Sequence, residues 1–366
     1  MSGIAVKFGV PVWKIVYDNQ LKDKNQIVPG QALLLLEVDE GQAEESTQPE
    51  LAKGKTIGGY AYPFIDKEIL EQSFPALKEL LVFSYGFTFE GNLVPPLQDD
   101  LWMIETAWRH GAKPIMVLTP FSEGAFNNQL VKVLTENVEV QERLLEQLTA
   151  EVRRRGFAGV NIDFEYVKKD FADDYLQFLR ELSIACQNNG LVLSVDNYKP
   201  ANHNAHYELA EQAVFVDYIV IMGYDEHYAG SDAGSVASLP FVEDGISRAV
   251  SMVPSEQVIN AVPFYTRIWT ENAGETKSRA VGMQAAMDAM QENGATAEWD
   301  ETTGQYYCTY ETSAGTVQIW FEEDRSIGEK MKLYSKYKLG GVAEWKLGLE
   351  TSSVWSIISN GLNYAS

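Results

Sequence analysis

Residues 159–165 read Gly-Val-Asn-Ile-Asp-Phe-Glu. Residue type alternates strictly here, so a β-strand would carry three apolar side chains on one face and Asn161, Asp163 and Glu165 on the other. One wet face is typical of an antiparallel strand, whereas a parallel strand is covered on both faces. In a parallel sheet this polar row would therefore point into a closed barrel. Since buried carboxylates are costly unless they are paired or used, the row predicts a functional site.

The chain around this stretch, from Ile57 onward, alternates short apolar or β-branched runs with longer helical patterns. Such alternation is typical of a parallel sheet with crossover helices, and eight runs favour closure into a barrel. The sequence thus predicts the α/β class and a (β/α)8 TIM barrel. The expected strands are Gly58–Tyr62, Leu80–Tyr85, Pro114–Leu118, Gly159–Glu165, Leu191–Val195, Tyr218–Tyr224, Val258–Phe264 and Gly341–Trp345.

The gap between the last two expected strands, residues 270–336, is too long for one crossover helix. It contains a helical pattern from Gly282 to Asn293 and a hairpin-like pair of strands around Gly304 and Gly315. We therefore expect an inserted α+β subdomain between strands seven and eight of a barrel that spans residues 57–366.

The first 37 residues form a separate unit, whose pattern predicts helix, turn and strand, the strand ending near Leu33. Residues 38–56 are rich in Glu, Gln, Ser and Thr and poor in large apolar side chains, as expected of an acidic linker. Near Met1 no basic segment precedes an apolar one, so no signal peptide is expected in the chain as given.

Composition narrows the classes of partner. Acidic residues outnumber basic ones 52 to 29, a net charge of −23, which opposes binding to nucleic acid or to anionic membranes. No apolar run approaches the roughly 20 residues of a membrane-spanning helix. The four histidines lack a metal-binding spacing, and the two cysteines, Cys186 and Cys308, are expected to be packing residues. We expect neither a metal nor a cofactor.

Asp163 and Glu165 lie one strand repeat apart, about 6–7 Å along the backbone. Two carboxyls at this spacing can keep one of them protonated near neutral pH, which makes an acid. Glu165 ends its strand, where barrel enzymes place catalysis, and Asp163 lies one layer deeper, where it can orient and tune Glu165. The pair predicts a general acid, Glu165, with a supporting carboxyl.

Two further strand ends carry candidate residues. Met222-Gly223-Tyr224-Asp225 closes the sixth strand, where the Tyr224 hydroxyl can donate to a substrate carbonyl. Trp345 ends the eighth strand and can form an apolar floor for a sugar ring. Taken alone, a Tyr-Asp pair is more often structural and a tryptophan is more often part of the core. A functional interpretation of either one therefore depends on Asp163 and Glu165 of the fourth strand.

Together these motifs resemble glycoside hydrolase family 18. Residues 159–165 resemble the end of its D-x-x-D-x-D-x-E signature and residues 222–225 its M-x-Y-D, while Pro263-Phe264-Tyr265 and residues 340–345 also match. Ala158 and Asn161 stand where the signature has its first two aspartates.

The resemblance implies a retaining mechanism in which the substrate's N-acetyl oxygen attacks the anomeric carbon. Glu165 would protonate the leaving oxygen, Asp163 would stabilise the intermediate through its nitrogen, and Tyr224 would hold the acetamido carbonyl. Trp345 would carry the sugar at the cleavage position. The other substrate-binding residues that it implies are Met222, Asp225, Asn161 and Tyr265.

Residues 1–37 resemble the latter part of a LysM module, a binder of N-acetylglucosamine-containing glycans, without its usual first strand. The combination is similar to LysM-linked family 18 proteins of spore-forming bacteria, which include N-acetylglucosaminidases acting on spore-cortex peptidoglycan. It implies a protein of the cell envelope, the spore or the extracellular space.

Three functions follow. Hydrolysis of β-1,4 bonds after N-acetylglucosamine in peptidoglycan comes first, and hydrolysis of chitin oligomers is the alternative with the same mechanism. A non-catalytic, chitinase-like glycan-binding protein is a third, against which Glu165 argues because such proteins usually lose the acid. In each case the partner is an N-acetylated glycan, and we expect a monomer.

Overall fold

The computed structural model describes residues 2–10, 12, 15–16, 33, 55–122 and 125–363. The chain divides into two compact units, Met1–Glu50 and Leu51–Ser366. In the first unit, α1 (Ser2–Phe8) ends at the first residue of the pattern that predicts a helix, which runs from Phe8 to Val16, and Ala5, Val10 and Ile15 form a small apolar cluster. Apart from Leu33 itself, the expected strand that ends near Leu33 and the linker up to residue 54 lie outside the described residues.

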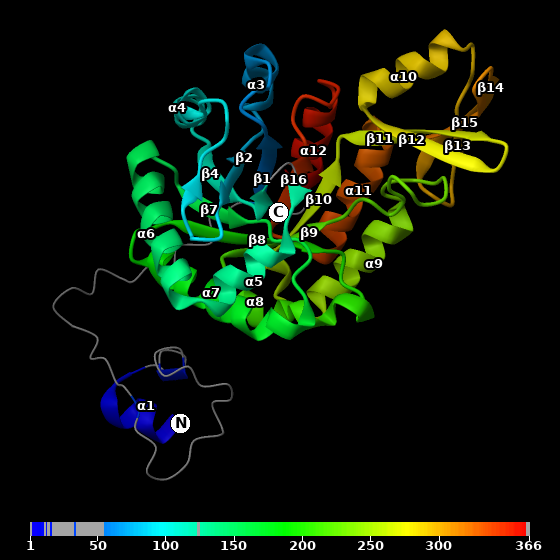
Figure 1. Ribbon diagram of the computed structural model, residues 1–366. Coiled ribbons are helices and arrows are strands. Elements are labelled where there is room, and N and C mark those ends of the chain that lie inside the picture. Colours follow the sequence, from blue (N-terminus) through cyan, green and yellow to red (C-terminus); the bar gives the residue numbers. More distant parts are fainter. Residues whose placement is uncertain are drawn as a thin grey trace. The chain divides into compact units, whose positions relative to one another are not determined.

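Eight parallel strands of the main sheet form a closed barrel, because β1 pairs both with the last strand and with β2 (Figure 1). All eight expected strands are present, so the predicted (β/α)8 TIM barrel is confirmed. The barrel strands are β1 (Thr56–Ala61), β2 (Glu79–Phe87), β4 (Lys113–Leu118), β7 (Gly159–Ile162), β8 (Val192–Tyr198), β9 (Tyr218–Met222), β10 (Val258–Pro263) and β16 (Gly341–Trp345).

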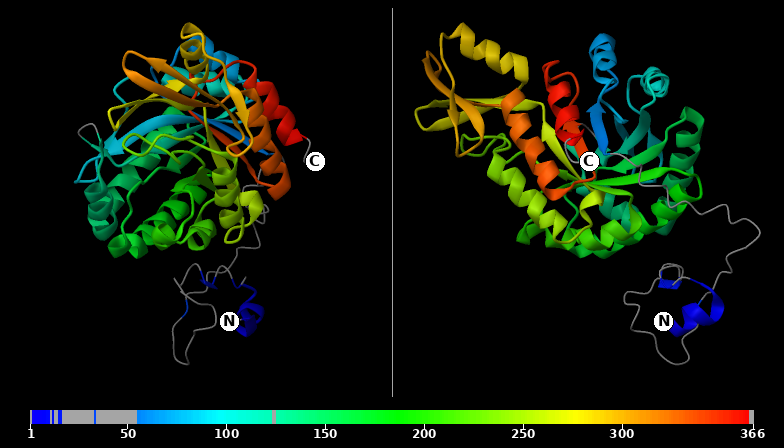
Figure 2. Two further views of the ribbon diagram at one scale, coloured as in Figure 1. Left: turned by 90° about the vertical axis from the view of Figure 1, so that its right-hand side faces the viewer. Right: turned by 180° about the vertical axis from the view of Figure 1, so that it is seen from behind.

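Helices surround the barrel, and Figure 2 shows them from two further sides. They are α3 (Lys67–Ser73), α4 (Leu101–Arg109), α5 (Asn128–Glu136), α6 (Val138–Arg155), α7 (Ala172–Gln187), α8 (Leu209–Phe215), α9 (Leu239–Val250), α11 (Asp324–Tyr337) and α12 (Val354–Asn363). Short elements at the strand ends are β3 (Leu93–Val94), β5 (Phe121–Ser122), β6 (Ala125–Phe126) and the 3-10 helices η2 (Lys169–Phe171), η3 (Asn202–Tyr207) and η4 (Ser255–Gln257).

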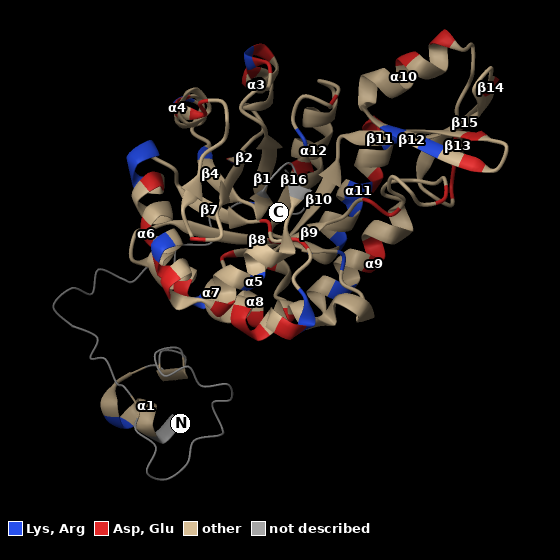
Figure 3. Cartoon of the chain, in the orientation of Figure 1, with Lys and Arg blue, Asp and Glu red and all other residues tan. Residues whose placement is uncertain are grey.

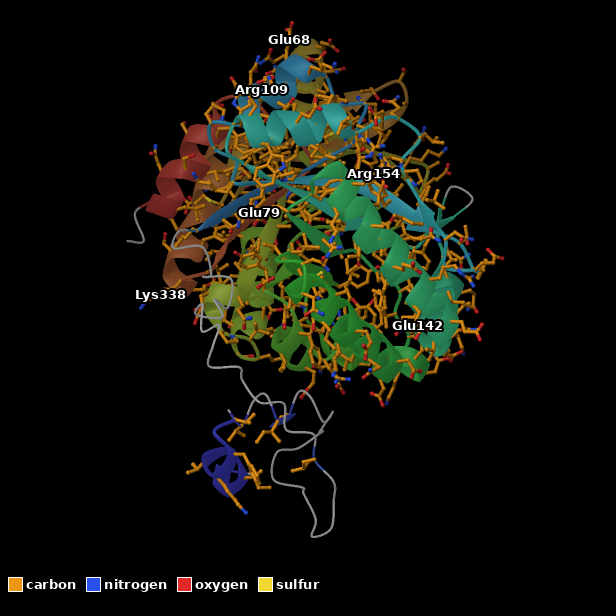
Figure 4. The ribbon with its side chains drawn as sticks, turned by 90° about the vertical axis from the view of Figure 1, so that its left-hand side faces the viewer. Glu68, Glu79, Arg109, Glu142, Arg154 and Lys338 are labelled. Carbon is orange, nitrogen blue, oxygen red and sulfur yellow. The ribbon has the colours of Figure 1, made fainter. Side chains whose placement is uncertain are left out.

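The ends of α6 illustrate how local sequence sets these helices. The Asn137 side chain accepts a hydrogen bond from the Val140 N–H, and Gly156 follows the last turn at φ 83°, a conformation that favours glycine. Figure 4 shows α6 along the outside of the barrel, with Glu142 and Arg154 on it. Figure 3 shows that charged residues gather on the outer helices, whereas the barrel strands carry few.

The barrel sheet has an inner face and an outer face that packs against the helices. The side chains of β7 alternate between these two faces, as its sequence predicts. Its apolar residues belong to the large cluster that includes residues of the surrounding helices, whereas Asn161 and Asp163 are buried on the other face. The strand is shorter than expected. Its pairing with β8 ends at Ile162, and Tyr166, at φ 60°, turns the chain away, so Asp163 and Glu165 follow the strand end directly.

The additional sheet between β10 and β16 is antiparallel, with the order β12-β11-β15-β14-β13. It begins at Tyr265, before the expected boundary at Thr270, because β11 follows β10 almost without a loop. The expected helix is present as α10, whereas α11, which falls inside the expected insertion, packs against α9 and α12. The elements are β11 (Tyr265–Asn272), β12 (Glu275–Gly282), α10 (Met283–Glu292), β13 (Glu298–Asp300), β14 (Gln305–Thr312) and β15 (Gly315–Phe321).

Cys186 and Cys308 are both free and buried in apolar clusters, as expected of packing residues. Among the described residues, no helix is both long and apolar enough to cross a membrane.

Candidate active site

The candidate residues meet at the carboxyl end of the barrel, the end that carries catalysis in enzymes of this fold. Asp163 and Glu165 follow β7, Tyr224 and Asp225 follow β9, and Trp345 ends β16. Residues from three different strands are thereby brought to one end of the barrel, as the sequence predicts.

Glu165 is partly buried, and its carboxylate accepts a hydrogen bond from the Tyr198 hydroxyl. Burial raises its pKa above the ordinary glutamate value; the Tyr198 hydrogen bond opposes this shift and the charge of Asp225 adds to it. A carboxyl whose pKa is raised in this way retains its proton closer to neutral pH, as a general acid requires.

Asp163 lies deeper, with an exposed fraction of only 5%, and its Oδ1 has no hydrogen-bond partner among the described residues. Burial raises its pKa well above the usual range, and the charges of Asp196 and Glu165 raise it further. The three carboxyls therefore titrate as a group rather than independently.

Sequence reasoning missed two residues of this site, both on β8. The Asp196 carboxylate accepts hydrogen bonds from the Asn161 amide (2.8 Å) and from the Tyr60 hydroxyl (2.7 Å), and Tyr198 is the donor to Glu165. The signal was present, because Ser194, Asp196 and Tyr198 alternate with apolar or buried residues just as residues 161–165 do. Because the expected strand ended at Val195, Asp196 and Tyr198 were not recognised as part of a second polar row.

Asn161, expected among the substrate-binding residues, is fully buried. Its amide donates to Ser194 at 3.0 Å and to Asp196 at 2.8 Å. The Asn161 side chain thus links β7 to β8 beneath Asp163. It holds the Asp196 carboxylate rather than facing the open end of the barrel.

Tyr224 lies beside Asp225 and Tyr265. The Tyr265 hydroxyl donates to the Asp225 carboxylate, and the rings of Tyr224 and Tyr265 meet edge to face with centroids 6.3 Å apart. Burial raises the Tyr224 pKa well above its usual value, and nearby carboxyls, Asp196 first among them, raise it further. The Tyr224 hydroxyl therefore keeps its proton and remains a hydrogen-bond donor. Met222 is the last residue of β9 and is partly buried.

Trp345 lies in an aromatic group. Its ring contacts Phe83, Tyr60 and Tyr62 edge to face at centroid distances of 4.9, 5.6 and 6.2 Å. Because Trp345 is only partly buried, this arrangement fixes the indole while leaving part of it available to a sugar ring. Within the described chain, no three His, Cys, Asp or Glu side chains are arranged to hold a metal ion.

Comparison with known families decides the assignment. The model of glycosyl hydrolases family 18 matches residues 116–350, and the LysM model matches residues 1–35. The chain belongs to glycoside hydrolase family 18. It is a glycoside hydrolase with a (β/α)8 barrel, an additional sheet and an N-terminal LysM match, and its partners are N-acetylated glycans such as peptidoglycan or chitin.

Curated relatives of this family 18 enzyme include bacterial and animal proteins. A cortical fragment-lytic enzyme of Bacillus subtilis is 28% identical over 312 residues, which cover 81% of this chain and 70% of the relative. The putative sporulation-specific glycosylase YdhD of the same bacterium is 28% identical over 78% of this chain and 70% of its own. A probable endochitinase of Caenorhabditis elegans is 25% identical over 81% of this chain and 56% of the relative.

Solved structures agree on the fold. The spore cortex-lytic enzyme SleL of Bacillus megaterium aligns with a TM-score of 0.79 at 22% identity, covering 99% of this chain and 84% of SleL. A chitinase of Chromobacterium violaceum aligns with a TM-score of 0.78 at 21% identity, covering 84% of this chain and 99% of the chitinase. At these identities the likeness concerns the barrel architecture alone.

Proposed function

We propose that this family 18 enzyme hydrolyses, with retention, the β-1,4 bonds that follow N-acetylglucosamine in peptidoglycan, and that spore cortex is its substrate. The single observation that carries the proposal is the meeting of Glu165, Asp163 and Tyr224 at the carboxyl end of the barrel, beside Trp345. These groups suit a sugar that carries an acetamido group.

In the first step the acetamido oxygen attacks the anomeric carbon, the glycosidic bond breaks, and Glu165 gives its proton to the leaving oxygen. In the second step water attacks the same carbon and returns a proton to Glu165, so the configuration is retained. The raised pKa of Glu165 supports the first role, because the acid must be protonated when the bond breaks.

Asp163 and Tyr224 act on the acetamido group. Asp163 accepts its N–H and so stabilises the cationic intermediate, while the Tyr224 hydroxyl donates to its carbonyl oxygen and orients it for attack. Both groups are buried enough for these hydrogen bonds to be strong in a site of low dielectric constant. Trp345 carries the sugar ring. The same substrate-binding site is lined by Met222, Asp225 and Tyr265.

The choice of peptidoglycan rests on the LysM match and on the relatives whose names refer to cortex or sporulation. The net charge of −23 favours a glycan with few carboxylate-bearing peptide stems, because like charges repel within about 10 Å at moderate salt. From the LysM match and these relatives we infer that the protein works at the cell envelope, on the spore or outside the cell. We further propose that it is a monomer.

Chitin is the second candidate, favoured by the match to a probable endochitinase. Both substrates present an N-acetyl group at the cleavage position, so the chemistry of the site is the same for each.

The test compares the wild type with Glu165→Gln on purified spore cortex, vegetative wall and chitin oligomers, with products identified by mass spectrometry. Release of fragments ending in N-acetylglucosamine from cortex, lost in the variant, is the expected result. Cleavage of chitin alone would replace peptidoglycan by chitin. Binding without cleavage in both forms would identify a non-catalytic glycan-binding protein instead.

A further inference from the structure

The signature departure at position 161 leaves an amide where a carboxyl is expected. Asn161 can neither ionise nor hold an exchangeable acid proton, yet it lies in the inward row directly beneath Asp163. Its amide nitrogen instead reaches across to a carboxyl on the next strand, Asp196, at 2.8 Å.

We propose that Asp196 on β8 is the partner carboxyl of Asp163, and that the two share one proton during the reaction. Asp196 thus supplies from the neighbouring strand what position 161 lacks. It is a positioning residue, because it acts on the substrate only through Asp163. The inference rests on the proposed acetamido-assisted mechanism.

The register of the two strands supports this pairing. In β7 and β8, Asn161 lies opposite Ser194 and Ile162 opposite Val195. Continued one residue past the last printed pair, this register places Asp163 opposite Asp196, and strands of a sheet lie about 4.8 Å apart. The charge of Asp196 acts on Asp163, as expected of neighbouring side chains. Both residues are almost completely buried, with exposed fractions of 5% and 6%.

Among the described residues, no cation contributes to the electrostatics of the pair. The charges that shift the pKa values of Asp163, Asp196 and Glu165 all belong to other carboxyls, and no lysine or arginine of the described chain contributes. Two adjacent buried carboxylates without a cation cannot both stay ionised at low cost, so one proton remains on the pair. The other ionisable groups around it are Glu165 and the phenols of Tyr60, Tyr62, Tyr175, Tyr207 and Tyr224.

Hydrogen bonding decides where that proton sits in the free enzyme. Tyr60 and Asn161 both donate to Asp196 Oδ1, which stabilises the ionised form of Asp196, whereas Asp163 Oδ1 has no donor among the described residues. Asp163 therefore holds the proton before substrate binds.

Substrate binding changes this balance. To accept the acetamido N–H, Asp163 must ionise, so its O–H bond breaks and the proton forms a new O–H bond on Asp196, through Oδ2. No other group changes charge in this transfer. The pKa of Asp196, which burial raises to about 7, suits a group that takes up and returns a proton near neutral pH.

The test uses Asp196→Asn and the exchange variant Asn161→Asp/Asp196→Asn, which returns the carboxyl to β7. Asp217→Asn is the control: Asp217 is a partly buried carboxyl that, like Asp196, accepts a hydrogen bond, in its case from the backbone N–H of Leu193 on β8, but it lies at the other end of the strands. Rates are measured against pH on the N-acetylated glycan that the wild type cleaves, and thermal unfolding is followed for each variant.

We expect Asp196→Asn to lower kcat on the order of 100-fold with little change in KM, because it removes the partner in a proton transfer. The acidic limb of its pH profile should move to higher pH, because Asp163 must then ionise by itself in a buried position, whereas in the wild type the negative charge of the pair resides on Asp196, which Tyr60 and Asn161 stabilise. The exchange variant should recover both kcat and the limb toward the wild type, and Asp217→Asn should match the wild type.

An unchanged acidic limb in Asp196→Asn would overturn the inference, even if the rate fell, since a purely structural role would lower the rate without moving the limb. So would a folded exchange variant with no recovery. If the exchange variant fails to fold, the profile of Asp196→Asn decides alone. A wild type that cleaves no glycan would count against the proposed function instead.

Discussion

Removing the hydroxyl of Tyr198 is a direct way to change the pKa of the proposed general acid, Glu165. This hydroxyl donates to the Glu165 carboxylate, and the hydrogen bond holds down a pKa that burial otherwise raises. Replacing Tyr198 with phenylalanine removes the donor and keeps the ring. Because the hydrogen bond stabilises the ionised form, its loss must raise the pKa of Glu165 further.

The size of the shift follows from the kind of bond. A hydrogen bond to a charged group contributes about 1.5–3 kcal/mol, and the lower end applies because Glu165 is partly exposed. At about 1.4 kcal/mol per pKa unit, the shift is about one unit. Since Glu165 must be protonated to act as the acid, activity is lost as pH rises through its pKa, and the basic limb of kcat/KM should move about one unit higher.

The assay is the release of reducing ends across a pH series, with Tyr310→Phe as a control on the distant additional sheet. A basic limb that stays in place, or that moves to lower pH, would refute the assignment of that limb to Glu165.

Three further changes have defined outcomes. Tyr224→Phe should lower kcat/KM by about 10²–10³, as loss of one donor in such a site does, whereas a loss under threefold in steady-state kinetics would remove Tyr224 from the mechanism. Lys330→Met should destabilise the fold by about 3–5 kcal/mol in denaturant unfolding, because it leaves Glu322, bonded to Lys330 at 2.8 and 2.9 Å, buried and unpaired; an unchanged midpoint would contradict this. Trp345→Ala should weaken glycan binding by Glu165→Gln in calorimetry, and equal affinity would argue against a sugar floor.

The eight barrel strands were predictable because each is a short apolar run with its own local pattern. The polar row of residues 161–165 was predictable for the same reason, since alternation alone fixes which side chains share a face. What local pattern cannot give is the pairing between strands. Asp196 meets Asn161 only through the β7–β8 register, and so the third carboxyl escaped notice.

The start of the additional sheet escaped prediction for a related reason. β11 follows β10 almost directly. At Tyr265 the chain passes from the parallel barrel into the antiparallel sheet without the polar loop that normally marks a boundary. Similarly, the helical pattern of α11 is clear, but only its packing against α9 and α12 assigns it to the barrel rather than to the insertion.

In the proposed reaction, Glu165 cleaves the glycan with the help of the substrate's own acetamido group. The most direct measurement compares wild type and Glu165→Gln on spore cortex before and after chemical removal of N-acetyl groups, with the anomer of the fresh product read by NMR. The prediction is a β-anomeric product ending in N-acetylglucosamine, formed only by the wild type and only from the acetylated cortex. Equal cleavage of the deacetylated glycan, an initial α-anomer, or full activity of Glu165→Gln would contradict it.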